Sequence, residues 1–384
     1  MNVSFLVPNV GGSSLGFATA FARALATRHC VQILGPDIWG GGVMPIYRGC
    51  FDYQAIAAPR LYRFPEYWWQ ARRLGRAARG DVLFAVKAMP QTVGVALREK
   101  RRRGCPVVVC LDEWDGALMA RRSPAERRAF WRRHWMHPLE ENYYPRVERT
   151  FSQADLVLST STFLQRKFGG MVVRMGADTD RFQPVSPADK AAVRAQLGLD
   201  AGHRVIVFGG VVRPHKGVEL ILQAMARANE PALRLLVVGP VTDTLRELLN
   251  GPHGGQIVAA GNRPLDEMPR WLGAGDFTVL PLADDLLAQS QVPCKVFEAM
   301  AMGLPVLASQ VSDLPEIVAG AGATFPAGDV DALAGLLRQW IREPSVLAAY
   351  AREARRRAVE SYSASVMRSQ LLAAVARLTE RSGG

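Results

Sequence analysis

The sequence predicts an α/β protein with two doubly wound, Rossmann-like domains, and three observations support this. Short apolar runs of the kind that form buried strands recur along the chain. Stretches with helical periodicity separate these runs, and this alternation is typical of parallel sheets covered by helices on both faces. With 384 residues, of which 49% are hydrophobic, the chain is long enough for two domains with a core each.

The first half of the chain alternates between expected strands and helices. An apolar strand at residues 3–7 is followed by a small-residue turn and by a helix at residues 15–28. Four more apolar runs are expected to form strands: residues 31–34, 81–86, 107–111 and 155–159. Residues 172–183 lead out of this region, so we expect the first domain to span residues 1–178.

The second half repeats the alternation. A helix at residues 188–197 leads into expected strands at residues 205–208, 235–239, 257–261, 276–281 and 306–308. Amphipathic periodicity predicts two long helices near the end of the chain, at residues 346–359 and 364–378. We expect the second domain to span residues 179–360 and residues 361–384 to form a separate C-terminal helix. Ligands of doubly wound sheets bind at the carboxyl ends of the strands, so the predicted site is a cleft between two facing domains.

Positive charge is concentrated in the first half of the chain. The net charge is +12, and residues 1–180 hold 26 Lys and Arg against 15 Asp and Glu, a net +11. The densest runs are residues 98–103 and 121–133. Two interpretations remain open: arginines on solvated helices, or a surface for an anionic partner such as a lipid headgroup, a phosphorylated carrier lipid or an acidic acceptor. Nucleic acid is disfavoured because no nucleic-acid-binding module is recognisable.

Residues 60–79 interleave five aromatic side chains with arginines, which suits contact with an anionic membrane surface or packing over the first sheet. No apolar run reaches the ~18 residues that span a bilayer, and the first residues lack a basic leader. The five cysteines are scattered without CxxC spacing, which fits a reducing compartment and gives no metal site. We therefore expect a cytoplasmic protein, with peripheral contact at the inner membrane surface as an option.

A phosphate-binding pattern lies at residues 204–217, which read RVIVFGGVVRPHKG. A short apolar strand runs into Gly209 and Gly210, which allow a sharp turn and the close approach of a phosphate. Arg213 and Lys216 follow, directly before a segment with helical periodicity. The order of strand, glycine turn, basic residue and helix is the one in which α/β folds hold phosphates.

A second pattern lies at residues 293–316, which read PCKVFEAMAMGLPVLASQVSDLPE. It predicts a short helix that contains Glu298, then a sharp stop, a strand, and a loop that carries Glu316. Cys294 and Lys295 lie at the start of this helix, where free backbone N–H groups can bind an anion. A buried carboxylate needs a partner, and a ribose diol can supply one. The pattern therefore predicts a nucleotide, with its diphosphate on the amides and its ribose on Glu298.

Together the two patterns resemble the donor-binding motifs of retaining GT-B glycosyltransferases of family four, the glycosyltransferase group 1 type. That family has a Gly-x-x-Arg-Pro-x-Lys-Gly variant and a Pro-x-Lys-x-x-Glu-ala-met-ala-x-Gly-x-Pro-Val pattern, and similar residues occur here in the family's order. The resemblance covers about residues 204–318. It implies the GT-B fold, in which two Rossmann-like domains face each other across a cleft and the C-terminal helix returns to the first domain.

The resemblance also implies a function and a set of site residues. The function is retaining, metal-independent hexosyl transfer from a UDP- or GDP-sugar to a hydroxyl of a glycan, lipid-linked or small-molecule acceptor, as in polysaccharide or glycolipid biosynthesis. No cofactor and no metal ion are expected. Lys216 and Arg213 are the implied catalytic cations, which stabilise the leaving diphosphate. The implied donor-binding residues are Gly11, Gly12, Gly209, Gly210, Asn262, Arg263, Ser290, Cys294, Lys295, Val296 and Glu298.

Two stretches depart from the family pattern. Ser290 stands where many members carry a glutamate that touches the donor sugar, which leaves the sugar open and keeps altered or lost catalysis as an alternative. Asp112 and Glu113 follow a predicted strand where many relatives carry a histidine. An acid there can orient or deprotonate an acceptor hydroxyl, so we name both as catalytic candidates. Trp114 either stacks on a sugar or packs the loop, and Lys87, at a neighbouring strand end, is a further candidate.

Two other functions remain open on the sequence. A nucleotide-sugar epimerase of the same fold needs paired acid and base residues near the sugar, and the Pro-x-Lys-x-x-Glu pattern argues against it. A non-catalytic subunit that binds a sugar nucleotide would tolerate Ser290. Donor hydrolysis or transfer by the purified protein distinguishes the transferase from such a subunit.

Overall fold

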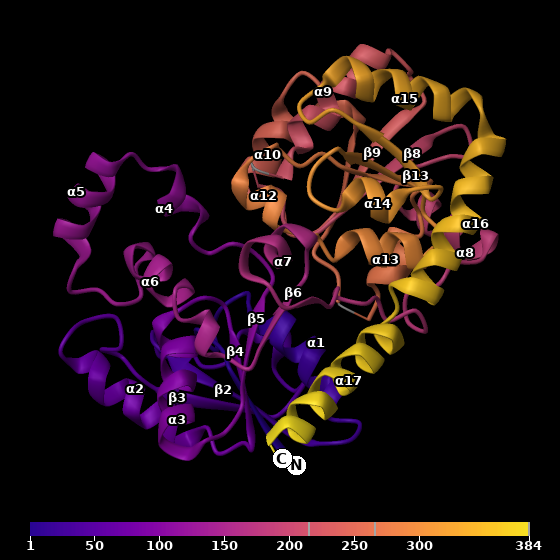
Figure 1. The fold of residues 1–384 in the computed structure, drawn as a ribbon. Helices are drawn as coiled ribbons and strands as arrows, with labels where there is room; N and C mark the ends of the chain where they lie inside the picture. Colours follow the sequence, from indigo (N-terminus) through magenta and orange to yellow (C-terminus); the bar gives the residue numbers. More distant parts are fainter. Residues whose placement is uncertain (214–215, 265, 383–384) are drawn as a thin grey trace. The chain divides into compact units, whose positions relative to one another are not determined.

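The computed structural model describes residues 1–213, 216–264 and 266–382. The chain divides into two compact units: unit 1 comprises Met1–Met175 and Met367–Gly384, and unit 2 comprises Gly176–Val366. In each unit, helices cover both faces of a parallel sheet (Figure 1). The α/β class and the doubly wound arrangement that the alternating pattern predicts are therefore confirmed.

Unit 1 is built on a parallel sheet with the order β3-β2-β1-β4-β5-β6-β7. Its strands are β1 (Asn2–Leu6), β2 (Cys30–Asp37), β3 (Tyr53–Ala57), β4 (Val82–Val86), β5 (Val107–Leu111), β6 (Leu156–Ser159) and β7 (Met171–Val172). The chain order reverses between β1 and β4. Residues that follow these two strands therefore border the crevice where ligands of doubly wound sheets bind.

The helices of unit 1 bury two separate cores. One core contains side chains of α1 (Leu15–Leu25) and α17 (Ala364–Ser382). The other contains side chains of α2 (Glu66–Ala77), α3 (Val95–Arg103), α6 (Tyr144–Glu148) and α7 (Thr162–Phe168). Helices α4 (Ala117–Arg121) and α5 (Pro124–His134) connect β5 to α6 and stand away from the strands (Figure 1). All residues of α5 are described, and none of them is buried.

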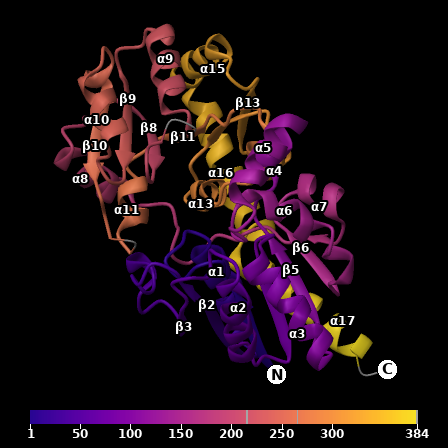
Figure 2. The same ribbon diagram turned by 90° about the vertical axis from the view of Figure 1, so that its left-hand side faces the viewer.

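Unit 2 is built on a parallel sheet with the order β10-β9-β8-β11-β12-β13, and Figure 2 shows β10, β9, β8 and β11 side by side from left to right. Its strands are β8 (Arg204–Gly209), β9 (Leu233–Val238), β10 (Ile257–Gly261), β11 (Phe277–Leu280), β12 (Val306–Ser309) and β13 (Gly322–Phe325). Here the chain order reverses between β8 and β11, which places the ligand crevice of this sheet at the ends of those two strands.

Both faces of the second sheet are covered. One core contains side chains of α9 (Val218–Ala228), α10 (Asp243–Asn250) and α15 (Val330–Arg342). The other contains side chains of α8 (Pro187–Gln196), α11 (Met268–Leu272), α13 (Lys295–Ala301), α14 (Leu314–Val318) and α16 (Pro344–Ser361). Along β8, Val205 and Val207 enter one core while Ile206 and Phe208 enter the other. Burial on both faces is why this strand reads as a continuous apolar run.

The strands that the sequence did not predict lie at sheet edges. Strands β3 and β7 are the two edges of the first sheet, and β13 is an edge of the second. Edge strands are only partly buried here, so their sequences lack the apolar run that marks the central strands. One local prediction is wrong: Glu316 lies in the helix α14 rather than in a loop. Within the described residues, no helix is both long and apolar enough to cross a membrane.

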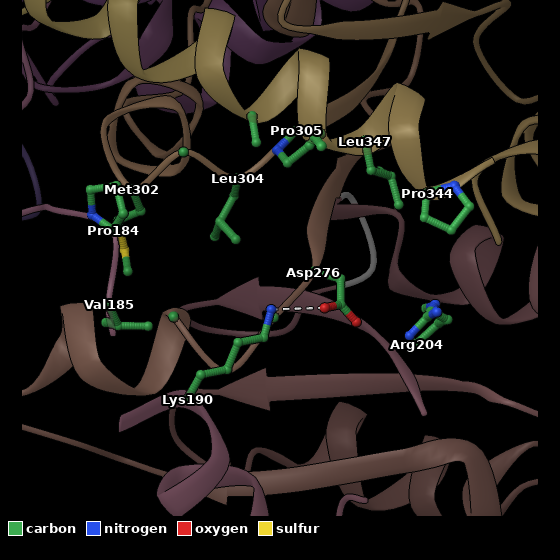
Figure 3. A pocket seen from close by; sticks show the side chains of 15 residues that line it. Pro184, Val185, Lys190, Arg204, Asp276, Met302, Leu304, Pro305, Pro344 and Leu347 are labelled. Atoms are coloured by element: carbon green, nitrogen blue, oxygen red, sulfur yellow. Dashed lines mark hydrogen bonds and ion pairs between the residues drawn. The ribbon is translucent and has the colours of Figure 1, made fainter. Parts of the chain in front are cut away.

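Asp276, directly before β11, links α8 to the amino end of β8 through ion pairs and a hydrogen bond (Figure 3). Its carboxylate lies 2.8 Å from Lys190 Nζ and 2.8 Å from Arg194 Nη2, and it accepts the backbone N–H of Val205 at 2.8 Å. Burial alone would raise the pKa of Asp276, but Lys190, the N–H of Val205 and Arg194 together lower it below its ordinary value. The charged form of Asp276 is therefore stabilised in the folded chain.

Candidate functional site

The predicted donor residues of unit 2 gather at the carboxyl edge of its sheet. Three groups make up this set: Gly209, Gly210, Arg213 and Lys216 at and after β8, Asn262 and Arg263 after β10, and Ser290, Cys294, Lys295, Val296 and Glu298 between β11 and β12. Parallel strands end at a common edge, and β8 and β11 are the neighbours between which the chain order reverses. This placement puts the two sequence patterns side by side at the expected crevice.

Lys295 reaches over the end of β8. Its Nζ lies 4.4 Å from the centroid of the Phe208 ring. A Cβ atom on Gly210 would lie 2.9 Å from the same Nζ, and Gly210 has a φ of +106°. A side chain at residue 210 would be strained and would crowd the lysine, so the glycine turn makes room for the ammonium group.

Gly217 fixes the loop that carries Lys216. Its φ is +70°, and a Cβ atom there would overlap the backbone oxygen of Pro281, directly after β11. The backbone N–H of Lys216 donates to the carbonyl of Arg213 at 2.9 Å. Lys216 therefore precedes α9 in a tight turn packed against the end of β11. Pro214 and His215 lie outside the described residues.

The two lysines repel each other beside one carboxylate. Burial first, and the charge of Lys216 next, lower the pKa of Lys295 to about 8. Burial also raises the pKa of Glu298, although Lys295 and Arg181 oppose this. Gly209, Lys295 and Glu298 line a pocket of about 170 Å³. Two neighbouring cations that disfavour each other's charge make a place where an anion binds favourably.

Ser290, which the sequence predicts to contact a donor sugar, has its hydroxyl group hydrogen-bonded within its own helix. The residue is fully buried at the end of α12 (Leu286–Ser290), and its hydroxyl donates to the carbonyl of Leu287 at 2.7 Å. Asp285 begins this helix by accepting the N–H groups of Leu287 and Ala288, each at 2.9 Å. A contact between Ser290 and a donor sugar stays a prediction.

The remaining donor candidates of unit 2 have diverse surroundings. The guanidinium carbon of Arg263 lies 3.6 Å from the ring centroid of Trp271, a cation–π contact within the unit. Asn262 is exposed, Cys294 is half-buried next to the start of α13, and Val296 is buried in the core. The backbone N–H of Val296 donates to the carbonyl of Pro293 at 3.1 Å, and a contact between Val296 and a donor stays a prediction.

In unit 1, Lys87 forms ion pairs with the acidic residues that the sequence predicts near the acceptor. Lys87 follows β4, and the acidic residues follow the neighbouring strand β5. Its Nζ lies 2.8 Å from Asp112 and 3.6 Å from Asp115, and it also pairs with Glu113. The sequence predicts Lys87 at the end of a neighbouring strand, which the sheet order β4-β5 confirms, but it does not predict these ion pairs, because they depend on side-chain contacts across the sheet.

The cluster is buried and electrostatically coupled. Burial alone would lower the pKa of Lys87, but Asp115, Asp112 and Glu113 raise it above its ordinary value. Burial raises the pKa of Asp115 to about 6, against the opposing charge of Lys87. Lys87 also has a φ of +72°, a strained conformation of the kind found at functional sites. An acid–base role for Asp112 and Glu113 stays a prediction.

Trp114 belongs to the packing of unit 1. Its indole N–H donates to Glu148 at 2.9 Å, and the ammonium group of Lys167 lies 3.8 Å from its ring centroid. These contacts favour the packing interpretation over sugar stacking, because one face of the ring already carries a cation.

Gly11 and Gly12 follow β1 in unit 1. Their N–H groups bond to the side chain and the backbone oxygen of Asn9, each at 3.1 Å. A Cβ atom on Gly11 would meet its nearest neighbour at 3.5 Å, which is an ordinary contact. The fold itself therefore does not demand glycine at residue 11, and the predicted approach of a phosphate stays a prediction.

Sequence reasoning missed Arg181 and Phe208. Arg181 contributes charge at Glu298, and Phe208 contacts the ammonium group of Lys295. A signal for Arg181 existed, because it lies in the segment GADTDRF that leads into the second domain. Among the residues that the structure describes, no group of three or more His, Cys, Asp or Glu side chains is placed to hold a metal ion.

Residues 202–343 match the family model of the glycosyl transferases group 1. The matched region runs from β8 to α15 and is similar in sequence to that family. The matched region contains Lys216, and it also contains Lys295 and Glu298, which line the pocket described above.

Curated relatives and solved structures agree with this assignment. A D-inositol 3-phosphate glycosyltransferase of Segniliparus rotundus is 35% identical over 38% of this chain and 33% of its own length. A GDP-mannose-dependent monoacylated alpha-(1-6)-phosphatidylinositol monomannoside mannosyltransferase of Corynebacterium glutamicum is 30% identical over 51% of this chain and 53% of its own. The chain thus spans about a third to a half of the curated relatives it matches.

Among solved structures, HepE of Anabaena, in complex with UDP, has a TM-score of 0.76 and 18% identity, covering 98% of this chain and 100% of its own. The sucrose-phosphate synthase of Thermosynechococcus elongatus has a TM-score of 0.75 and 18% identity, and the match covers 99% of this chain and 100% of the synthase chain. At such identities the likeness concerns the fold. The two units have the GT-B fold.

Proposed function

We propose that the chain is a retaining glycosyltransferase that uses a nucleotide diphosphate sugar. The observation that carries the proposal is the pair Lys216 and Lys295, close enough to repel, beside Glu298 at the crevice between β8 and β11. A donor has two matching groups: the diphosphate for the two ammonium groups, and the ribose diol for the carboxylate. These contacts relieve both the repulsion of the lysines and the unfavourable burial of Glu298.

In the proposed reaction, the acceptor hydroxyl attacks the anomeric carbon on the face from which the nucleotide leaves. The bond from that carbon to the phosphate oxygen breaks, the bond to the acceptor oxygen forms, and the departing phosphate oxygen takes the acceptor proton. Negative charge grows on the diphosphate in the transition state, so a preorganised cation at Lys216 lowers the barrier. Lys216 and Lys295 supply this countercharge, and we propose that transfer needs no metal ion.

The donor is proposed to be a UDP- or GDP-sugar with a hexosyl group. Two relatives support the two bases: HepE was solved with UDP, and the mannosyltransferase of Corynebacterium glutamicum is described as GDP-mannose-dependent. The acceptor is proposed to be a hydroxyl of a glycan, a lipid-linked or a small-molecule acceptor, as in polysaccharide or glycolipid synthesis in the cytoplasm.

The experiment that tests the function is donor consumption by the purified chain in the presence of EDTA. We expect one UDP- or GDP-sugar to release its nucleotide, with the donor's anomeric configuration kept in a transfer product. Release of no nucleotide from any donor, together with nucleotide binding, would favour a non-catalytic subunit. Interconversion of free nucleotide sugars without transfer would favour an epimerase.

Peripheral membrane contact is proposed for unit 1. Trp68 and Trp69 on α2 have exposed fractions of 55% and 57%, and Arg72 and Arg73 on the same helix are exposed as well. Exposed tryptophans beside arginines suit an anionic bilayer surface, where the indole rings sit at the headgroup level.

The variant Trp68→Ser/Trp69→Ser is expected to lower the affinity for vesicles of phosphatidylglycerol by about tenfold or more, because two apolar rings no longer leave water. Cosedimentation with vesicles measures this. The control is Trp39→Ser, which removes a ring that is 80% exposed but not on α2. Equal cosedimentation of the double variant and the wild type would remove α2 from any membrane contact.

A further inference from the structure

The segment between β5 and α6 encloses a pocket in unit 1 that the proposed reaction does not use. Its volume is about 510 Å³, within the ~300–1,000 Å³ typical of small-molecule sites. Helices α4, α5 and α6 supply its walls, and Figure 1 shows α5 standing away from the strands. A helix without buried residues gains little from packing, so its place over a pocket calls for another account.

Five arginines line this pocket against a single carboxylate. The arginines are Arg127, Arg128, Arg132, Arg146 and Arg149, and the carboxylate belongs to Glu148. Glu148 accepts the indole N–H of Trp114, and burial raises its pKa, which weakens it as a countercharge. Like charges gathered around one cavity repel one another, and an anion in the cavity would relieve this.

The arginines fall into two kinds. Arg127 and Arg146 are held in place: Arg127 donates to the carbonyls of Arg122 and Ala120 at 2.9 and 2.7 Å, and the guanidinium of Arg146 lies 3.9 Å from the ring centroid of Trp131. The other three, Arg128, Arg132 and Arg149, make no hydrogen bond or ion pair within the described part of the chain. Their donors remain available to a ligand.

Asn142 gives independent support. It lines the same pocket, its exposed fraction is 3%, and neither its amide nitrogen nor its amide oxygen has a hydrogen-bond partner among the described residues. A buried amide without partners is costly, because it has lost its hydrogen bonds to water. A polar ligand that enters the pocket, directly or through a water molecule, would satisfy it.

We propose that this pocket binds a phosphate-bearing group. Guanidinium groups match phosphate oxygens in geometry and charge, and Trp131 adds an apolar wall. On the transferase function proposed above, on which this step rests, the phosphate belongs to the acceptor. Its source is either a soluble phosphate ester or a phospholipid headgroup, and the chemistry that the pocket recognises is the same for both.

The test compares the variant Arg128→Ala/Arg132→Ala/Arg149→Ala with a control of equal charge, Arg28→Ala/Arg133→Ala/Arg166→Ala. The control arginines are exposed, lie in unit 1 outside α2, and are absent from the walls of this pocket. Arg133 lies on α5 itself. The soluble probe is D-inositol 3-phosphate, measured by thermal shift and calorimetry, and the lipid probe is vesicles of phosphatidylglycerol with phosphatidylcholine vesicles as blank.

We expect the pocket variant to bind one of the probes at least about tenfold more weakly than the control does, because charge-assisted hydrogen bonds are lost. Loss with the soluble probe identifies a free phosphate ester, and loss with vesicles alone identifies a headgroup. Equal binding by the two variants, or no binding of either probe by the wild type, overturns the proposal.

Two further readouts keep the outcomes apart. The nucleotide-induced thermal shift, which belongs to unit 2, is expected to survive in the pocket variant. A wild-type chain that binds the phosphate probe but no nucleotide would therefore overturn the transferase function and leave this pocket standing. The variant Asn142→Leu is expected to melt no lower than the wild type, because it removes an unsatisfied amide, and to bind the probe more weakly. Unchanged probe affinity would exclude Asn142 from the site.

Discussion

Replacing Lys216 with alanine is expected to lower kcat/KM for donor turnover by about a hundredfold or more, the loss typical of removing one preorganised group that stabilises transition-state charge. The fold should stay intact, because Gly217 and the bond from the Lys216 N–H to Arg213 position the loop through the backbone. A second effect is specific to the charge. Lys216 lowers the pKa of Lys295, so its removal should raise that pKa from about 8 toward the ordinary lysine value.

Steady-state kinetics with the donor measure the first effect, and the pH dependence of Lys295 labelling by an amine reagent measures the second. Arg270→Ala is the matched control, since it removes an exposed cation of unit 2 that does not line the pocket. Turnover at the wild-type rate in Lys216→Ala would remove Lys216 from the reaction. A Lys295 pKa that does not move would show that the two ammonium groups are not neighbours.

The variant Asp276→Asn is expected to lower the free energy of unfolding by about 3 kcal/mol at neutral pH, because breaking a buried ion pair leaves cations without a partner. Lys190 and Arg194 both depend on this carboxylate, as Figure 3 shows for Lys190. The pKa of Asp276 is lowered in the folded chain, so its stabilisation is complete above the ordinary carboxyl pKa of ~3.9. It is lost as the pH falls through the lowered value.

Denaturant unfolding at several pH values measures this effect. The difference between wild type and variant should stay constant near neutral pH and shrink below about pH 4. The control is Asp331→Asn, which breaks the exposed pair with Arg227 and should cost no more than about 1 kcal/mol. Equal stability of Asp276→Asn and wild type would mean that α8 is held by its apolar contacts alone.

The sequence predicts where the donor-binding candidates of unit 2 lie, because short patterns of neighbouring residues determine their positions. The order of strand, glycine turn and basic residue places Gly210 and Lys216 without knowledge of the rest of the fold. The same holds for Glu298, which the sequence places inside a helix and which α13 contains. The central strands are equally readable, because burial on both faces leaves an apolar run.

What the sequence leaves out depends on contacts between distant segments. The low pKa of Lys295 arises from burial and from the charge of Lys216, 79 positions earlier in the chain. Lys87 meets Asp112 and Glu113 only because β4 and β5 are neighbours in the sheet. The arginines of residues 121–133 read as a charged helix face, and only the fold shows that three of them line one pocket with Asn142.

The most direct test of the donor site is thermal melting of the wild type and of Glu298→Gln with UDP, GDP, ADP and dTDP, without added metal. A ligand that binds the folded state raises its melting temperature. Because burial raises the pKa of Glu298, its charge is unfavourable in the folded chain, and the variant without nucleotide should melt no lower than the wild type. We predict that one nucleotide raises the melting temperature of the wild type and that Glu298→Gln shows a smaller shift. No shift with any nucleotide, or an equal shift in both proteins, would contradict it.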